Sequence, residues 1–169
     1  NLVPGTNSAY VLKLDNNGNF VWARSWADNY SVVANDIAID ADGNVYTVGD
    51  YWSYVDFDPG PGTFYFYALN YRDVFVSKLD NNGNFVWAKS VGGTSSDRFS
   101  TIALDISGPL YITGNFESPT ISFGNTTLTN ADPTGASGDI FIAKLDRGPT
   151  GINELENYGS QISIFPNPF

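Results

Sequence analysis

The sequence contains no cysteine, no histidine and no methionine among its 169 residues. Because cysteine is absent, the chain has no disulfide framework, thiolate zinc site or cysteine nucleophile. Because histidine is absent, it also lacks imidazole metal ligands and the base of a Ser-His-Asp triad. Asn1 is not an initiator methionine, so we expect a processed chain or a piece of a longer one.

Positive charge is also scarce, with 8 lysines and arginines against 18 aspartates and glutamates and a net charge of -10. This field repels phosphate backbones and anionic membranes, so we expect no nucleic-acid partner. No apolar run approaches the roughly 18 residues that a membrane helix needs, so we expect no membrane span. Cations, neutral polymers and other proteins are the partners that this charge allows.

The sequence does contain an internal repeat with a period of about 65 residues. The run Asp15–Ala23 recurs unchanged as Asp80–Ala88, and the triplet Lys-Leu-Asp begins at residues 13, 78 and 144. The segment Asp36–Asp40 matches Thr101–Asp105. Self-similarity at a fixed period indicates a repeat architecture.

Each repeat is predicted to form short strands, because its segments are rich in β-branched and aromatic residues and show no sustained helical period. The segments Asp-Asn-Asn-Gly-Asn and Asp-Ala-Asp-Gly-Asn are typical of tight hairpin turns, in which glycine supplies a positive φ. They resemble the start of a calcium loop, but they lack the glutamate that such a loop has at its twelfth position. We therefore expect an all-β fold with essentially no helix.

Four antiparallel strands in a repeat of this size suggest a blade of a β-propeller. The run Asp73–Ser90, with Asp36–Gly49 and Asp56–Gly62, is similar to the bacterial β-propeller repeats called SBBP, which are related to NHL-type blades. The resemblance implies four-stranded blades in a surface or secreted protein and no particular ligand. It assigns the strands of the complete blade, from innermost to outermost, to Ile37–Asp40, Asn44–Tyr51, Val74–Leu79 and Phe85–Ser90.

The chain is expected to hold an incomplete set of blades. Residues 1–146 contain a partial blade at 8–26, a full blade at 35–90 and an incomplete blade at 99–146. About two and a quarter blades cannot close a ring, because propellers typically have four to eight. We therefore expect part of a larger ring or an assembly, whose partners are the missing blades of a longer chain or further copies. We expect the outer strand of the last blade to come from one of three sources: elsewhere in a longer propeller, the segment Gln161–Phe165 of this chain, or another copy through self-assembly.

The tail has two expected parts. Residues 147–160 are predicted to be a linker, and residues 161–169 form a short apolar strand that ends in Pro-Asn-Pro-Phe. This ending resembles the start of the C-terminal sorting domain of type IX secretion cargo in Bacteroidota. The resemblance implies recognition by the type IX secretion machinery and an extracellular or outer cell-surface location. The alternative is a proline-terminated edge strand.

The candidate binding residues lie in loops expected on one rim, at 27–34, 52–72, 91–98 and 117–138. The loops at 52–72 and 117–138 are long enough to carry an extra hairpin. In the 52–72 loop, aromatic rings suit stacking on the sugars of an extracellular polysaccharide. The candidate ligand-binding residues are Trp52, Tyr54, Tyr65, Tyr67, Tyr71 and Arg72. The alternative, which we favour, is that the aromatics pack this loop onto a neighbouring blade.

Asp56 and Asp58 are the candidate metal ligands, because hard carboxylate oxygens next to a rigid turn suit Ca²⁺. The second repeat has Ile121-Ser-Phe-Gly-Asn125 at this place, so we favour a turn-forming role for the two acids. We expect no cofactor, with Ca²⁺ as the one candidate. Trp22 and Trp87 are predicted to pack between blades.

No feature of the sequence points to catalysis. The spacing of the acids selects no catalytic pair, and no phosphate-binding Gly-Lys loop or Gly-x-Ser-x-Gly motif occurs. Gly49 and Gly114 are interpreted as positions that backbone geometry requires. We expect a non-catalytic, secreted or cell-surface repeat module with a structural, adhesive or self-assembling role. The alternatives are a carbohydrate-binding module and a non-catalytic fragment of a polysaccharide-active enzyme.

Overall fold

The computed structural model describes residues 8–26, 31–105, 108–132, 134 and 136–145, and the backbone of a short strand at 163–164. Strands are the only regular elements of this part of the chain, so the predicted all-β fold is confirmed. This part has no helix with the length and apolar character needed to cross a membrane. The strands are β1 (Ala9–Leu14), β2 (Phe20–Trp26), β3 (Val32–Ile39), β4 (Val45–Asp56), β5 (Tyr65–Leu79), β6 (Phe85–Val91), β7 (Asp97–Leu104), β8 (Leu110–Phe116), β9 (Thr120–Phe123), β10 (Thr126–Thr129), β11 (Asp139–Leu145) and β12 (Ser163–Ile164).

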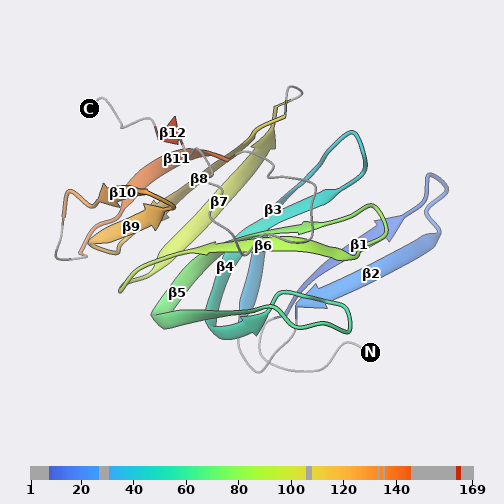
Figure 1. Ribbon diagram of the computed structural model, residues 1–169, viewed down its shortest axis with the longest axis horizontal. Helices are drawn as coiled ribbons and strands as arrows, with labels where there is room; N and C mark the ends of the chain where they lie inside the picture. Colours follow the sequence, from blue (N-terminus) through green and yellow to red (C-terminus); the bar gives the residue numbers. More distant parts are fainter. Residues whose placement is uncertain are drawn as a thin grey trace.

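The strands form a series of antiparallel sheets (Figure 1). β3, β4, β5 and β6 follow one another in a four-stranded meander, and β7, β8, β11 and β12 are arranged in the same order. β1 pairs with β2 in a two-stranded sheet, and β9 pairs with β10 in a separate hairpin. The two four-stranded sheets have the strand order of β-propeller blades, as the repeat predicts.

Several strands are longer than the sequence predicts. β3 starts at Val32 rather than Ile37, and β4 and β5 continue into the predicted 52–72 loop as one long hairpin. The β4–β5 pair changes register between Trp52 and Tyr54. Because alternation is interrupted at such an irregularity, the sequence pattern predicts that these strands end too early. The extra hairpin predicted in the next repeat is present as β9 and β10.

The outer strand of the last sheet comes from the tail of this chain. β12 pairs antiparallel with β11, with Ile164 opposite Ala143 and Ser163 opposite Lys144. Of the three predicted sources of this strand, the structure therefore shows the segment within Gln161–Phe165. The predicted linker and the Pro-Asn-Pro ending lie outside the described residues.

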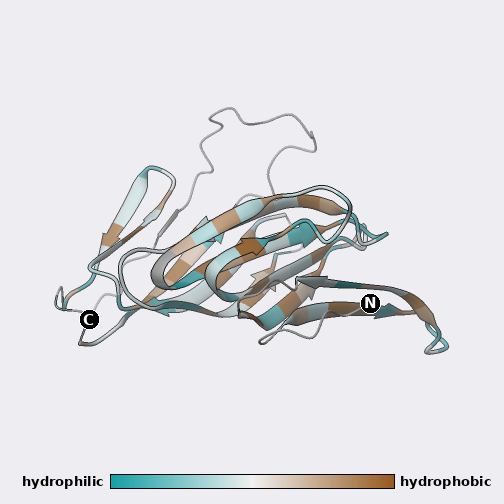
Figure 2. Ribbon diagram, turned by 90° about the horizontal axis from the view of Figure 1, so that it is seen from below, coloured by the Kyte–Doolittle hydropathy of each residue, from teal (hydrophilic) through white to brown (hydrophobic). Residues whose placement is uncertain are grey.

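Two hydrophobic cores lie between successive sheets. The first joins the β1–β2 sheet to the β3–β6 sheet and includes Trp26 and Phe75. The second joins the β3–β6 sheet to the β7–β12 sheet and includes Tyr46 and Phe141. Hydrophobic and polar residues alternate along many of the strands (Figure 2). In β4 every residue of Val45–Tyr51 is buried, because this strand has a core on each side.

A bulge recurs in the innermost strand of each four-stranded sheet. The register of β3 shifts beside Gly49, and that of β7 shifts beside Gly114. A Cβ on Gly49 would lie 1.9 Å from the carbonyl oxygen of Val33, and one on Gly114 would lie 2.3 Å from that of Arg98. Neither position has room for a side chain, so the predicted backbone requirement at both glycines is confirmed.

The Asp-Asn-Asn-Gly-Asn segments are hairpin turns, as predicted. In the first, one carboxylate oxygen of Asp15 accepts hydrogen bonds from the amides of Asn17 and Asn19 at 2.9 and 2.8 Å. Gly18 has a φ of 82°, which side chains rarely allow. The aspartate thus takes the place of backbone acceptors within the turn.

The second of these turns, at residues 80–84, also joins neighbouring sheets. The indole Nε1 of Trp22 donates a hydrogen bond to the carbonyl of Asn81 at 3.1 Å. Trp87, at the equivalent place in β6, packs against the second core with its ring edge-on to Tyr46. Both tryptophans therefore pack between sheets, as predicted.

Candidate functional site

The outer part of the β4–β5 hairpin has two faces of different character. Directly paired residues point to the same face, and successive residues point to opposite faces. Val55 is paired with Phe66 and lies on one face. The other face, which we call the tyrosine face, carries two cross-strand pairs: Tyr54 with Tyr67, and Asp56 with Tyr65.

The face opposite the tyrosine face anchors the hairpin to the first core. Val55 and Phe57 are fully buried. The ring centroid of Phe57 lies 4.7 Å from that of Phe75 and 5.3 Å from that of Tyr51. Because tilted and edge-on aromatic contacts of this kind stabilise a core, the hairpin is held in a defined position.

The tyrosine face itself is turned to solvent. Tyr65 is 57% exposed and Tyr67 is 66% exposed. The ring of Tyr54 is nearly parallel to that of Tyr67, with an interplanar angle of 5° and centroids 6.4 Å apart, and it lies 6.0 Å from that of Tyr65. The favoured prediction, that these aromatics pack onto a neighbouring blade, is wrong for Tyr65 and Tyr67.

The other two aromatics predicted to bind a ligand, Trp52 and Tyr71, are 47% and 50% exposed. Both lie at the stretch where β4 and β5 change register, and Ser53 has a φ of 65° there. Strand alternation does not continue through such an irregularity, so it does not assign either ring to the tyrosine face.

The two candidate metal ligands organise the turn between β4 and β5. One carboxylate oxygen of Asp56 accepts hydrogen bonds from the amides of Asp58 and Phe64 at 3.0 and 2.7 Å. Asp58 accepts one from the amide of Gly60 at 2.8 Å. These bonds are those of a turn-forming motif. In the part of the chain that the structure describes, no group of three or more acidic side chains could hold a metal ion.

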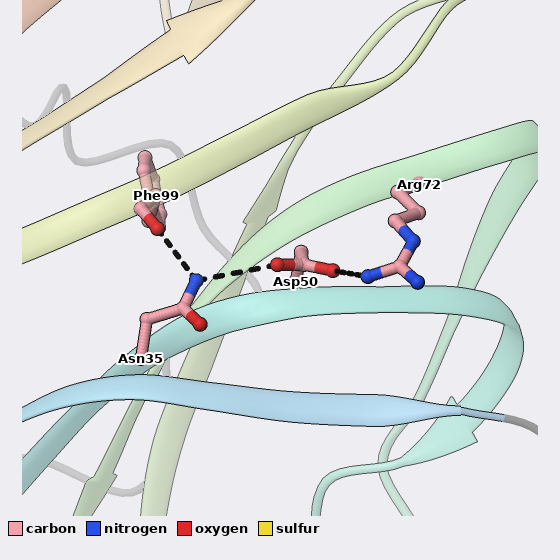
Figure 3. Close-up of polar contacts among 4 residues, drawn as sticks. All are labelled: Asn35, Asp50, Arg72 and Phe99. Atoms are coloured by element: carbon pink, nitrogen blue, oxygen red, sulfur yellow. Dashed lines mark hydrogen bonds and ion pairs between the residues drawn. The ribbon is translucent and has the colours of Figure 1, made fainter. Parts of the chain in front are cut away.

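Arg72, also predicted to bind a ligand, takes part in a polar network between sheets (Figure 3). Its Nη1 lies 2.5 Å from a carboxylate oxygen of the buried Asp50. The amide nitrogen of Asn35 donates to the other oxygen of Asp50 at 3.2 Å and to the carbonyl of Phe99 on β7 at 2.6 Å. The network thus neutralises a buried carboxylate and links β3 and β4 to the next sheet.

The sequence reasoning missed Asn35 and Asp50. Asn35 lies in the bulge of β3, where periodicity gives no indication of side-chain direction. The signal that could have found them is the difference between repeats, because the next repeat has Ser100 and Asn115 at the two places.

The β9–β10 hairpin has the same construction as the outer β4–β5 hairpin but a different exposed face. Its buried side chains Ile121 and Phe123 correspond to Val55 and Phe57. The positions of Tyr54, Tyr65 and Tyr67 are occupied by Thr120, Thr127 and Thr129, which pair across the strands in the same way. The three tyrosines are therefore a feature of one hairpin and not of the repeat.

A second exposed surface lies on the β1–β2 sheet. Tyr10, Leu12 and Leu14 are 64%, 50% and 49% exposed, and we call these three residues the β1 face. Their equivalents in β5 and β11 are all buried, and all of them except Ser77 belong to the hydrophobic core shared with the preceding sheet. These equivalents are Phe75, Ser77 and Leu79, and Phe141, Ala143 and Leu145.

A matching surface lies at the other end of the chain. Ile140 and Ile142 of β11 are 73% and 45% exposed, and we call them the β11 face. Their equivalents in β5, Val74 and Val76, are buried in the core shared with the following sheet. The β1 face and the β11 face thus correspond to the two sides that meet wherever two sheets of this chain pack together.

Two further acids are buried: Asp73 in the middle of β5 and Asp97 at the start of β7. The carboxylate of Asp97 accepts hydrogen bonds from the Ser118 hydroxyl at 2.8 Å and from the amides of Gly93, Glu117 and Ser118 at 3.0 to 3.2 Å. Among the described residues, Oδ1 of Asp73 is buried without a hydrogen-bond partner. Burial, and then the charge of Asp97, raise the pKa of Asp73 to about 7. Burial also raises the pKa of Asp97, and hydrogen bonds from Ser118 act against that rise.

Comparison with known proteins finds a distant relative. The chain is 29% identical over 148 residues to a protein of Acanthamoeba polyphaga mimivirus named uncharacterized WD repeat-containing protein L264. The match covers 85% of this chain but only 11% of the relative. No protein-family model matches the chain. Because WD repeats are four-stranded propeller blades, the likeness and the observed sheets together indicate a β-propeller-like repeat protein.

Proposed function

We propose that this chain is a non-catalytic structural module that docks against further sheets of its own repeat through the β1 face and the β11 face. The observation that carries the proposal is the internal comparison: the residues equivalent to Tyr10, Leu12 and Leu14 are buried in both other repeats, and all except Ser77 belong to the core shared with the preceding sheet. Covering the β1 face in the same way removes three large apolar side chains from water.

The strand pairing supports the same proposal. Among the described strands, β1 pairs with β2 alone, whereas the equivalent strands β5 and β11 each have a partner on both sides. An unpaired edge next to an exposed apolar face is a template for strand addition. The units that dock here are the missing blades of a longer chain or other copies of this one. Because the β1 face of one unit meets the β11 face of the next, head-to-tail docking builds rings or filaments.

The proposed location is extracellular or on the outer cell surface. It is supported by the similarity of Asp73–Ser90 to SBBP repeats and of residues 161–169 to the start of a type IX sorting domain. On this proposal the type IX secretion machinery is a partner. Removal of residues 161–169 is expected to retain the protein inside cells of a host that has this machinery. Undiminished export of the shortened chain would contradict the proposed location.

Docking between copies is tested by blocking one face at a time. Mass photometry over a range of concentrations is expected to show oligomers of the wild-type chain and none for Leu12→Lys or Ile140→Lys. A mixture of the two variants is expected to form dimers only, because one intact junction remains between them. Tyr67→Thr, which lies on neither face, is the matched control. A wild-type chain that stays monomeric at every concentration would contradict docking between copies.

Carbohydrate binding is a second candidate function. The observation that favours it is the exposure of Tyr65 and Tyr67 on a hairpin whose other side is anchored in the core. Aromatic side chains of this kind provide ligand contacts that are rigid and amphipathic.

A further inference from the structure

We propose that the tyrosine face binds a neutral polysaccharide, whose sugar rings lie on Tyr65 and Tyr67. This inference rests on the second candidate function and adds to it the residues and the class of ligand. It is independent of docking between sheets, because the tyrosine face shares no residue with the β1 face or the β11 face.

The hairpin does not need tyrosine to fold. The β9–β10 hairpin keeps large buried side chains on its anchored side and has Thr120, Thr127 and Thr129 at the tyrosine positions. A hydroxyl pair, Ser122 with Thr127 at 2.9 Å, occupies the face where the other hairpin has Asp56 and Tyr65. Since threonine suffices for this construction, the fold of the hairpin does not account for the exposed tyrosine rings.

The tyrosine face is ordered before any ligand binds. The anchored side holds Phe57 against Phe75 at 4.7 Å, so the backbone beneath the tyrosine face is fixed by the core. Tyrosine has few rotatable bonds, and the parallel packing of Tyr54 on Tyr67 restricts them further. A surface that is ordered before binding loses little conformational entropy when the ligand arrives.

The charges around the tyrosine face select the charge of the ligand. The carboxylate of Asp56 lies on the tyrosine face, and Asp58 follows in the adjoining turn. The positive charge of nearby Arg72 is engaged by Asp50. With a net charge of -10 on the whole chain, acidic polysaccharides are repelled. Ring faces that contact sugar C–H groups, with phenol groups that bond to sugar hydroxyls, suit a neutral chain.

The experiment is affinity electrophoresis in native gels that contain one polysaccharide each: a soluble β-glucan, an α-glucan, a mannan or the acidic polymer alginate. Wild-type protein is expected to be retarded by at least one of the three neutral polymers and not by alginate. The variant Tyr54→Thr/Tyr65→Thr/Tyr67→Thr carries the residues of the β9–β10 hairpin, so it is designed to fold. We expect its affinity to fall by at least about tenfold, as for loss of a central aromatic contact.

Thr129→Ala is the matched control, since Thr129 is the exposed residue of the β9–β10 hairpin that is equivalent to Tyr67 and lies on neither the β1 face nor the β11 face, and it is expected to leave retardation unchanged. Circular dichroism of the triple variant checks its folding, and Tyr65→Phe, which keeps the ring, is expected to retain most of the affinity. Three results would each overturn the proposal. The first is that no neutral polymer retards the wild-type protein. The second is that the triple variant is retarded as strongly as the wild type. The third is that the oligomeric state of the triple variant differs from that of the wild type when no polysaccharide is present.

Discussion

The buried carboxyl of Asp73 predicts an unusual dependence of stability on pH. Its pKa is raised from 3.8 to about 7, first by burial and then by the charge of Asp97. A group whose folded-state pKa is raised holds its proton more tightly in the native state. Its contribution to stability is therefore complete below about pH 4 and is lost as the pH rises through about 7.

The size of the effect follows from the shift. A difference of about three pKa units corresponds to at most about 4 kcal/mol of unfolding free energy lost between about pH 4 and pH 8. Asp97 keeps its charge more readily because four hydrogen bonds reach its carboxylate, so Asp73 is the group that holds the proton. Replacing Asp73 with asparagine removes the titrating group and keeps the shape of the side chain.

Urea denaturation at about pH 5 and about pH 8 measures the prediction. We expect wild-type stability to fall between these values and Asp73→Asn to be the more stable protein at the higher pH, by about 2 to 4 kcal/mol. Asp139→Asn is the matched control, because Asp139 is the equivalent residue of the next repeat and accepts a hydrogen bond from the amide of Ala131 at 2.7 Å. If Asp73→Asn retains the wild-type pH profile, the reasoning about the buried carboxyl is refuted.

Three further substitutions probe the packing of the β3–β6 sheet. Ser77→Ala is expected to raise the free energy of unfolding by about 1 kcal/mol, because the Ser77 hydroxyl is buried without a partner among the described residues. A lower free energy of unfolding in urea denaturation would contradict this. Gly49→Ala is expected to cost more than about 3 kcal/mol or to prevent folding, because the added Cβ would meet the carbonyl of Val33; near-native thermal stability would argue against that clash. Arg72→Met is expected to cost about 3 kcal/mol by leaving the buried carboxylate of Asp50 without a counter-charge, and restored stability in the double variant Arg72→Met/Asp50→Asn would identify the cause.

The sequence alone was sufficient for the local structure and the order of the strands. The period of about 65 residues predicts equivalent sheets, and the Asp-Asn-Asn-Gly-Asn segments predict their turns. These features depend on neighbouring residues, on strand propensity and on the φ that glycine allows. The same reasoning identified Gly49 and Gly114, since their place in the repeat marks a backbone constraint. It placed strand ends poorly near bulges, where alternation is interrupted.

Only the tertiary structure decided what each side chain faces. Tyr65 and Phe66 are adjacent aromatic residues of β5, yet Tyr65 lies on the exposed face and Phe66 packs against the core. The sequence grouped Arg72 with the exposed aromatics, whereas folding brings it to Asp50, 22 positions away. The effect of the Asp97 charge on Asp73 and the exposure of the β1 face likewise depend on which sheets come together. The burial of a side chain and the charge around it depend on residues that are far apart in the chain and come together only in the fold. A repeat pattern therefore does not indicate which surfaces remain uncovered.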